Sequence, residues 1–288
     1  MIRIIIKRLY YFILSFFSIR MIIRIEFFRH FRRLPNLSNP LKLYEKIQCF
    51  KFNDDMEHYS QYVDKYEVRK FVKETISEKY LNNLLGLYDK VEDINFDTLP
   101  NRFVLKCTHG SGYNIICSDK EKLDIDGAKK QLKYWLNEDF YKISREPQYK
   151  LVKPRIVCEE YLDDKNNSLV DYKFFCFKGK PAFIQVDIDK YTKQKKNFYN
   201  TNWQLLNMKS CFKNHLYENA AVEVPRPENL DEMVLLAQKL SNKFKFVRVD
   251  FYSVNNQTVF GELTFTPASG FEPFFPDSVN YELGKLLD

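Results

Sequence analysis

Four polar side chains in the segment 245–270, KFVRVDFYSVNNQTVFGELTFTPASG, have a spacing that could hold a metal ion. Two β-patterned runs surround a candidate turn, and a hairpin centred on Asn256 pairs Asp250 with Glu262 and Arg248 with Thr264. Because side chains alternate along a strand, these four share one face. The other face is apolar: Val247, Val249, Phe251, Val259, Leu263 and Phe265. Opposed carboxylates repel unless a cation lies between them, which makes Mg²⁺ a candidate. The alternative is a solvated pair that Arg248 neutralises.

A short glycine-containing loop could hold phosphate. In FVLKCTHGSGYNIICSD (103–119), an apolar strand carries Lys106 near its end, and four residues follow closely: His109, Gly110, Ser111 and Gly112. Glycines let backbone N–H groups approach phosphate oxygens, and a lysine adds a point charge. The loop is not a Walker A motif, because the lysine precedes the glycines, and not a G-x-S-x-G elbow. A polar hairpin tip remains the alternative.

A third group of charged residues lies in the segment 156–181. An apolar strand runs into Glu159 and Glu160, and a later strand places Asp171 and Lys173 on one face. The carboxylates of Glu159 and Asp171 could accept hydrogen bonds from a sugar hydroxyl or a nucleotide edge. The alternative is that they are ordinary surface acids.

A rival motif predicts a different enzyme. Asp187 and Asp189 form the Asp-x-Asp pattern with which many nucleotide-sugar glycosyltransferases hold a metal ion. The same pattern occurs at 124–126, so it has little specificity. The four histidines are scattered and show no metal-ligand spacing: His30, His58, His109 and His215.

The basic excess of the chain is confined to its beginning. Lys and Arg number 45 against 38 Asp and Glu, a net charge of +7. Residues 1–34 contain eight basic residues and one acid, so the remainder is balanced. Without a basic face on the body, nucleic acid is not an expected partner. Six cysteines lack any C-x-x-C pair, which predicts free thiols and a cytoplasmic location.

The basic segment 1–34 is rich in aromatic residues and has two interpretations. Its longest uncharged run, Leu9 to Ile19, is shorter than the ~20 residues of a membrane span. No small-residue cleavage site follows that run. The segment is either one or two helices docked on the body or an arm lying at the inner, anionic face of the cytoplasmic membrane.

The remaining sequence predicts an α+β protein. A helical part spans 35–100, with a helix start at Ser38, Asn39 and Pro40 and a helix over 60–76. From 101 to 288 the pattern favours short strands, with helices at 126–137 and 228–242 and an irregular stretch at 189–227. The expected strands cover 102–107, 113–118, 155–162, 170–177, 181–187, 245–253 and 258–265.

Taken together, these motifs resemble the TupA-like ATP-grasp family, associated with teichuronopeptide and other surface-polysaccharide biosynthesis. The resemblance runs from NPLKLYEKIQ at 39 to ELGKLL, which begins at 282. It includes DKYEVRKFV, LPNRFVLKCTHGSGYNII, DYKFFCFKGKP and FVRVDFY…FGELTFTPASGF. It implies two α+β lobes that hold ATP between them.

The resemblance also implies residue roles. Lys106 matches the lysine on the ATP phosphates, Arg248 the arginine near the transferring phosphoryl group, and Asp250 and Glu262 the magnesium ligands. Thr264 stands where many ATP-grasp ligases have Asn, so a second magnesium is in question. The implied ATP-binding residues are Lys65, Lys106, His109, Gly110, Ser111, Gly112, Glu159, Glu160, Leu162, Asp171 and Lys173.

The implied reaction is ATP-dependent ligation. A carboxylate, plausibly a uronic acid of a free or lipid-linked glycan, would be phosphorylated and then attacked by an amine such as an amino acid. Two other functions stay open: a glycosyltransferase, and a nucleotide-binding interaction protein that has lost its catalytic site.

Overall fold

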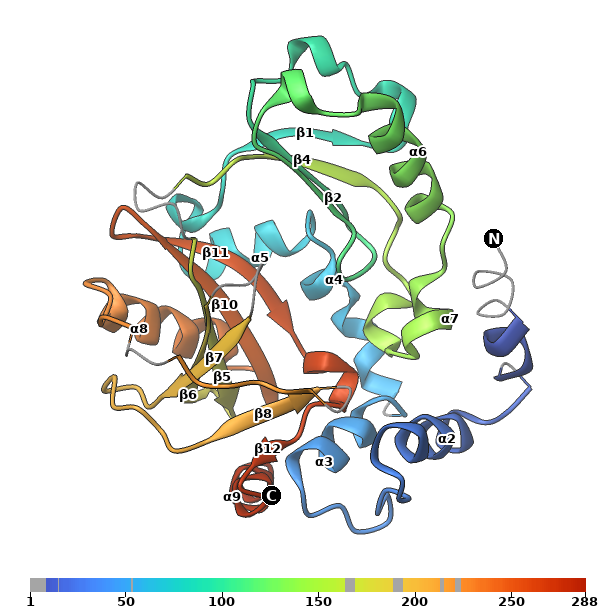
Figure 1. Cartoon of the computed structure of the whole chain (residues 1–288), viewed down its shortest axis with the longest axis vertical. Helices are drawn as coiled ribbons and strands as arrows, with labels where there is room; N and C mark the ends of the chain where they lie inside the picture. Colours follow the sequence, from blue (N-terminus) through green and yellow to red (C-terminus); the bar gives the residue numbers. More distant parts are fainter. Residues whose placement is uncertain are drawn as a thin grey trace.

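The chain folds around two antiparallel sheets, the smaller one at the top of Figure 1 and the larger one at its lower left. The computed structural model describes residues 9–14, 16–52, 54–163, 169–188, 194–212, 215–220 and 224–288. The smaller sheet has the order β1-β4-β2-β3. Its strands are β1 (Leu84–Tyr88), β2 (Phe103–Cys107), β3 (Asn114–Cys117) and β4 (Ile156–Glu160). Helix α6 (Ile125–Leu136) packs on it and contributes Leu132 to its buried core.

The larger sheet has the order β11-β10-β5-β6-β7. Its strands are β5 (Asp171–Phe177), β6 (Lys180–Ile188), β7 (Lys195–Tyr199), β10 (Phe246–Val254) and β11 (Gln257–Thr264). Helix α8 (Leu230–Ser241) covers one face with residues at helical spacing. These are Leu230, Met233, Leu236, Ala237 and Leu240. The opposite face packs Phe175, Phe183 and Phe246 into another core at one end, and carries polar side chains such as Lys173 and Asp250 at the other.

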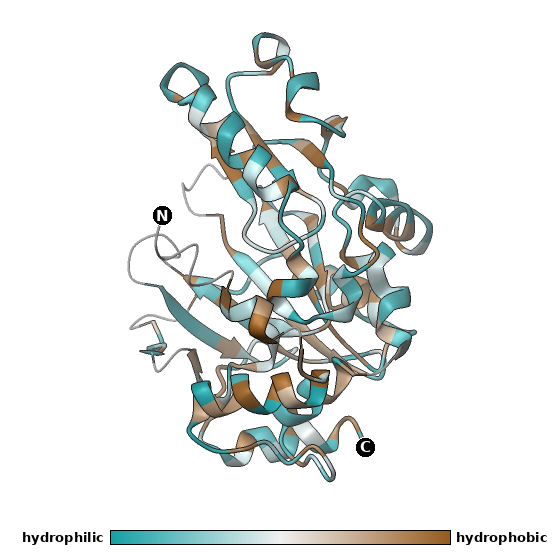
Figure 2. Cartoon of the chain, turned by 90° about the vertical axis from the view of Figure 1, so that its right-hand side faces the viewer, coloured by the Kyte–Doolittle hydropathy of each residue, from teal (hydrophilic) through white to brown (hydrophobic). Residues whose placement is uncertain are grey.

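Shorter elements surround the two sheets. A third, small sheet has the order β12-β8-β9, made of β12 (Phe274–Phe275), β8 (Lys209–Phe212) and β9 (His215–Leu216). The other α-helices are α2 (Ile19–Phe31), α3 (Leu43–Phe50), α4 (Ser60–Val63), α5 (Val68–Thr75), α7 (Phe140–Ser144) and α9 (Ser278–Lys285). Single 3-10 turns are η1 (Asp54–Tyr59), η2 (Glu78–Tyr80), η3 (Val91–Asp93), η4 (Phe96–Thr98), η5 (Lys120–Lys122), η6 (Pro147–Tyr149) and η7 (Pro267–Gly270). Hydrophobic and hydrophilic residues alternate along the helices in Figure 2, as expected when one helix face lies on a core.

The seven expected strands and the helices at 126–137 and 228–242 are all present, and the α+β class is confirmed. Three expectations were wrong. The helix over 60–76 is two helices, α4 and α5, separated by a turn in which the Asp64 carboxylate accepts hydrogen bonds from the backbone N–H groups of Tyr66 and Glu67. The helix expected to begin at Ser38, Asn39 and Pro40 is α3, which starts at Leu43. Strands β7, β8 and β9 lie in the stretch expected to be irregular, and β1 was not expected.

The hairpin of β10 and β11 has the predicted register near the site but not near its turn. Arg248 pairs with Thr264 and Asp250 with Glu262, as expected. The turn residues are Asn255 and Asn256, both with positive φ, as in a two-residue turn. A bulge follows Asp250 in the pairing, so Phe251 faces Phe260. Phe260 therefore enters the core in place of Val259, which was assigned to the apolar face.

The N-terminal arm lies against the body where it is described. Helix α2 buries Ile22, Ile23 and Phe27, and the Phe27 ring centroid is 6.0 Å from that of Tyr44 in α3. His30 stacks on Phe271, with centroids 4.1 Å apart. Residues 1–8 lie outside the described residues. In the part of the chain that is described, no helix has both the length and the apolar character to span a membrane.

Candidate functional site

A cavity of about 360 Å³ lies between residues of the two main sheets. Strands β2 and β4 line one side, and β5, β6, β10 and β11 line the other. Of the fifteen residues predicted for the site, ten line this cavity. They are Lys65, Lys106, Ser111, Gly112, Glu159, Asp171, Lys173, Arg248, Asp250 and Glu262. Segments distant in sequence therefore converge on one polar space.

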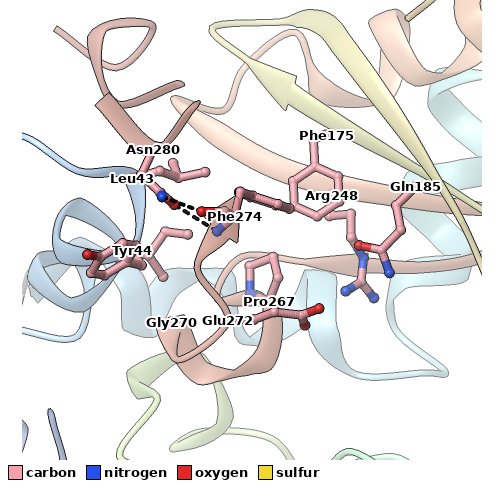
Figure 3. A pocket seen from close by; sticks show the side chains of 11 residues that line it. Leu43, Tyr44, Phe175, Gln185, Arg248, Pro267, Gly270, Glu272, Phe274 and Asn280 are labelled. Carbon is pink, nitrogen blue, oxygen red and sulfur yellow. Dashed lines mark hydrogen bonds between the residues drawn. The ribbon is translucent and has the colours of Figure 1, made fainter. Parts of the chain in front are cut away.

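The hairpin places a guanidinium between two carboxylates. Arg248 donates from Nε and Nη2 to Asp250, at 2.7 and 2.6 Å. Its Nη2 also donates to Glu262 Oε1 at 2.9 Å and to the Thr264 hydroxyl at 3.1 Å. The predicted grouping of these side chains on one face thus exists, with Arg248 neutralising the acidic pair. Arg248 points to the same side as Gln185 in the close view of Figure 3, where both line a small cavity of about 20 Å³.

A lysine on the neighbouring strand β5 lies near three carboxylates, of which Asp250 is shared with Arg248. Lys173 Nζ lies 2.8 Å from Asp171, 3.2 Å from Asp187 and 3.9 Å from Asp250. Burial opposes the charge of Lys173, but these carboxylates outweigh it and raise its pKa. Asp187, the described member of the rival metal motif, is thus held by Lys173 and by the Gln185 amide at 2.7 Å. Asp189 lies outside the described residues.

The opposite side of the cavity carries a second set of ion pairs. Lys106 Nζ on β2 lies 2.6 Å from Glu159 Oε2 on β4. Arg69 of α5 lies 3.5 Å from the other carboxylate oxygen of Glu159, and also donates to the carbonyl of Asn82 at 2.8 Å. Glu159 is therefore oriented by two cations, and it orients Lys106 toward the space between the sheets.

The glycine-containing loop contributes its tip to the cavity. Ser111 and Gly112 line it, and Gly112 has a φ of 77° that favours glycine. Lys65 Nζ donates to the carbonyl of Gly110, and burial lowers the pKa of Lys65. This contact links the helical region to the loop, so Lys65 can both support the loop and face the cavity.

Five predicted residues do not line this cavity. His109 is buried, its Nε2–H donates to the Trp135 carbonyl at 2.9 Å, and burial lowers its pKa. This hydrogen bond ties the glycine-containing loop to α6. Gly110 contributes its carbonyl to Lys65, the Glu160 carbonyl accepts from Asn82, and Leu162 lies outside the lining. Thr264 lines a different cavity, described below.

The cavity fits a magnesium ion that arrives with phosphate ligands. Among the described residues no group of three or more His, Cys, Asp or Glu side chains could hold a metal ion alone. Asp250 and Glu262 supply carboxylate oxygens on facing strands, and Mg²⁺ commonly combines one or two carboxylates with phosphate oxygens. These two residues would hold the ion, and Arg248 would share them with it.

The two carboxylates differ in proton affinity. Burial raises the pKa of Asp250 to about 6, against the opposing effect of Arg248 and Lys173. Burial also acts on Glu262, but Arg248 and Lys65 outweigh it and lower the pKa. Near neutral pH both are ionised, and on acidification Asp250 takes up a proton first.

Several lining residues were not singled out in the sequence: Arg69, Asn82, Asn114, Tyr252 and Gly261. Arg69 follows Lys65 by four residues and so could have been placed on the same helical side, although a helix break separates them. Asp187 was assigned to a rival site, but its pairing with Asp171 across β5 and β6 puts it here. Strand order, which the sequence did not provide, decides that placement.

A second cavity, of about 480 Å³, adjoins the first. The two share Ser111, Arg248 and Glu262 in their linings. The second is lined further by the N-terminal arm, by α7 and by the turn η7. A group bound at Arg248 can therefore be approached from two separate spaces.

A family model describes the chain from the first residues of the body to its last residue. The model for the TupA-like ATPgrasp family matches residues 45–288. The chain belongs to the TupA-like ATP-grasp family. This membership, with the two α+β lobes around a polar cavity, supports an ATP-dependent ligase.

The TupA-like protein also has distant likenesses among solved structures, while no curated protein matches it. D-alanine–D-alanine ligase from Bacillus anthracis, complexed with ATP, is 16% identical, with a TM-score of 0.41 over 70% of this chain and 53% of that chain. Phosphoribosylamine–glycine ligase from Thermotoga maritima is 12% identical, with a TM-score of 0.43 over 80% and 51%. The ATP-grasp ligase PsnB with a precursor variant, Mg and ADP is 11% identical, with a TM-score of 0.44 over 82% and 60%. The chain thus spans little more than half the length of such structures.

Proposed function

We propose that this protein is an ATP- and Mg²⁺-dependent carboxylate–amine ligase. Its substrates would be a uronic acid of a bacterial surface polysaccharide, free or lipid-linked, and an amino acid or similar amine. The observation that carries the proposal is the arrangement of Arg248, Asp250 and Glu262 opposite Lys106 and the loop tip in one cavity. Cations on both sides with two carboxylates suit a polyphosphate bound with a metal ion.

The reaction would proceed in two steps. A carboxylate oxygen of the uronic acid attacks the γ-phosphorus of ATP, and the bond to the bridging oxygen breaks to release ADP. The amine nitrogen then attacks the acyl carbon, an amide forms, and phosphate leaves with the bonding electron pair while the nitrogen loses a proton to solvent. Mg²⁺, when bound, neutralises charge on the transferring phosphoryl group.

The residues of this chain would position and shield these groups. The ammonium group of Lys106, which pairs with Glu159, would also donate hydrogen bonds to the phosphates. Lys65 would hold the loop over the phosphates through its hydrogen bond to the Gly110 carbonyl. Arg248 would stabilise negative charge that develops on the phosphoryl oxygens. Ser111 and Gly112 would exclude water, which otherwise hydrolyses an acyl-phosphate.

Binding and turnover test this proposal separately. Mg-ATP should raise the melting temperature of the purified chain, and nucleotide sugars should not. ADP should then form only when a uronic-acid oligosaccharide and an amino acid are both present. A shift with UDP-sugars and none with Mg-ATP would instead support a glycosyltransferase. ATP binding without ADP formation over a broad acceptor screen would contradict the ligase.

We further propose that the arm rests on an anionic lipid surface at the cytoplasmic face of the membrane. Its outer side carries exposed apolar side chains: Leu9, Phe12, Ile13, Phe16, Phe17, Met21 and Phe28. Exposed Arg24 and Arg32 lie on the same arm, and apolar plus basic residues together suit anionic lipids. Phe16→Ser with Phe17→Ser should reduce sedimentation with phosphatidylserine vesicles, whereas Leu235→Ser on exposed α8 should not. Equal sedimentation of both variants would contradict the contact.

A further inference from the structure

One side of the second cavity comes from a part of the chain that the family match does not include. Seven of its lining residues precede residue 45: Tyr11, Leu14, Ile22, Ile23, Glu26, Arg29 and His30. The arm is held there by buried contacts of α2, such as Phe27 against Tyr44. The arm therefore does more than cover the body, because it closes a space that opens onto Arg248.

One guanidinium in this cavity differs from the others. Arg29 is paired with Glu26 at 2.9 Å, and Arg248 with Asp250 and Glu262. Among the described residues, Arg145 donates only to the backbone carbonyl of Tyr11, at 3.4 Å. Its Nε is buried without a hydrogen-bond partner among the described residues, and within that part of the chain it makes no ion pair with a carboxylate.

Arg145 ends α7 in the left-handed conformation, with a φ of 56° that favours glycine. A buried, unpaired guanidinium nitrogen costs free energy unless it gains a partner. Arginine is suited to bind carboxylates with two parallel hydrogen bonds. A ligand anion in the second cavity would supply such a partner.

The rest of the lining suits a sugar chain. The stacked rings of His30 and Phe271, together with Tyr11 and Phe140, line the same space. Flat aromatic rings pack against the C–H faces of pyranose rings, and buried Lys51, which donates to the carbonyl and hydroxyl of Ser269, adds a positive charge to the lining. The cavity is also larger than the first one, 480 Å³ against 360 Å³.

We propose that the second cavity is the binding site of an acidic oligosaccharide, that the N-terminal arm forms its wall, and that Arg145 binds one of its carboxylates. A neighbouring carboxylate of the same saccharide would then lie near Arg248, where the two cavities meet. This inference rests on the proposed ligase function, which it extends by naming the acceptor site and the arm's part in it.

Calorimetric titration of the full chain, saturated with Mg-ADP, with trigalacturonate tests this site without any turnover. Arg145→Ala should weaken binding at least tenfold and leave Mg-ADP binding unchanged. Arg226→Ala, which removes a surface arginine paired with Asp231, is the matched control and should bind like the wild type. If Arg145→Ala melts early, Arg145→Gln replaces it.

The arm is tested by a matched pair on one helical segment. Tyr11→Ala, in the lining, should weaken trigalacturonate binding several-fold, whereas Phe12→Ala, 60% exposed on the outer side, should not. The proposal is overturned if the wild type does not bind trigalacturonate, or if Arg145→Ala and Tyr11→Ala both bind it normally. Failure of the ligase function alone would look different: trigalacturonate would bind at Arg145, but no ADP would form.

Discussion

The two adjoining cavities are built in different ways. The first lies between regular strands, and most of its cations are already paired: Arg69, Lys106, Lys173 and Arg248 each contact a carboxylate. The second is formed by an N-terminal arm, a short helix and a turn, and it contains Arg145 with an unpartnered nitrogen. The first cavity therefore keeps its geometry through internal ion pairs. In the second, the Nε of Arg145 has no hydrogen-bond partner among the described residues.

This contrast fits the two proposed roles, nucleotide binding in the first cavity and saccharide binding in the second. Paired charges on strands are held in fixed positions, which suits phosphoryl transfer, where positioning dominates. A wall made from a separate arm can change without disturbing the strands of the first cavity. Variants that affect one cavity and not the other are therefore the sharpest tests.

The largest expected effect comes from detaching the arm. Phe27→Ala removes a fully buried ring of α2 and should cost about 3 to 5 kcal/mol of the free energy that docks the arm. Trypsin should then cleave within residues 20–33, and trigalacturonate binding should fall, while Mg-ATP binding persists. Phe28→Ala, 48% exposed, is the control. If Phe27→Ala also abolished Mg-ATP binding, the two cavities would not be independent.

Removing the carboxylate of Asp250 from the first cavity should have the next largest effect. Asp250→Asn should lower the rate of ADP formation by about 10²–10³-fold, because a ligand of the metal ion is lost. The fold should survive, since Arg248 keeps Glu262, and Lys173 keeps Asp171. Asp231→Asn, in a surface ion pair, is the control for ADP release assays. An Asp250→Asn variant with normal turnover would show that the metal site is misplaced.

A smaller loss is expected at the opposite side of the same cavity. Lys106→Ala should raise the Kd of Mg-ATP about 10- to 100-fold, the loss of one charge-assisted contact. Glu159 would keep Arg69, so the melting temperature should change little. Lys122→Ala, an exposed lysine, serves as the control in nucleotide titrations. Weakened trigalacturonate binding in the Lys106→Ala variant would mean that the cavities are not independent.

The smallest effect is a pH dependence confined to the first cavity. Because the pKa of Asp250 is raised to about 6, this carboxylate is protonated as the pH falls through that value, and a neutral carboxyl is a poor Mg²⁺ ligand. Apparent Mg²⁺ affinity in Mg-ADP titrations should fall about tenfold for each pH unit below 6. Asp250→Asn provides the baseline that includes the protonation of the nucleotide itself. Parallel pH profiles for the two proteins would refute the assignment.

Much of the first cavity could be predicted from the sequence because its residues lie on strands. Alternation along β10 and β11 put Arg248, Asp250 and Glu262 on one face, and the register across them was right. The turn centre was off by half a residue, and a bulge beside Gly261 restored the register, which the pattern could not reveal. His109 was placed by proximity to the glycines, but its ring is buried beneath the loop.

The sequence by itself determined the α+β class, the principal strands, the family resemblance and many of the residues that line the first cavity, since these depend on local periodicity and on short motifs. Only the tertiary structure decided that Asp187 belongs with Lys173 and that Tyr11, Arg145 and Arg248 line one cavity. The physical reason is that the first grouping depends on how β5 pairs with β6, and the second on packing between segments more than a hundred residues apart. Neither hydrophobic periodicity nor charge spacing carries information about which distant segments meet.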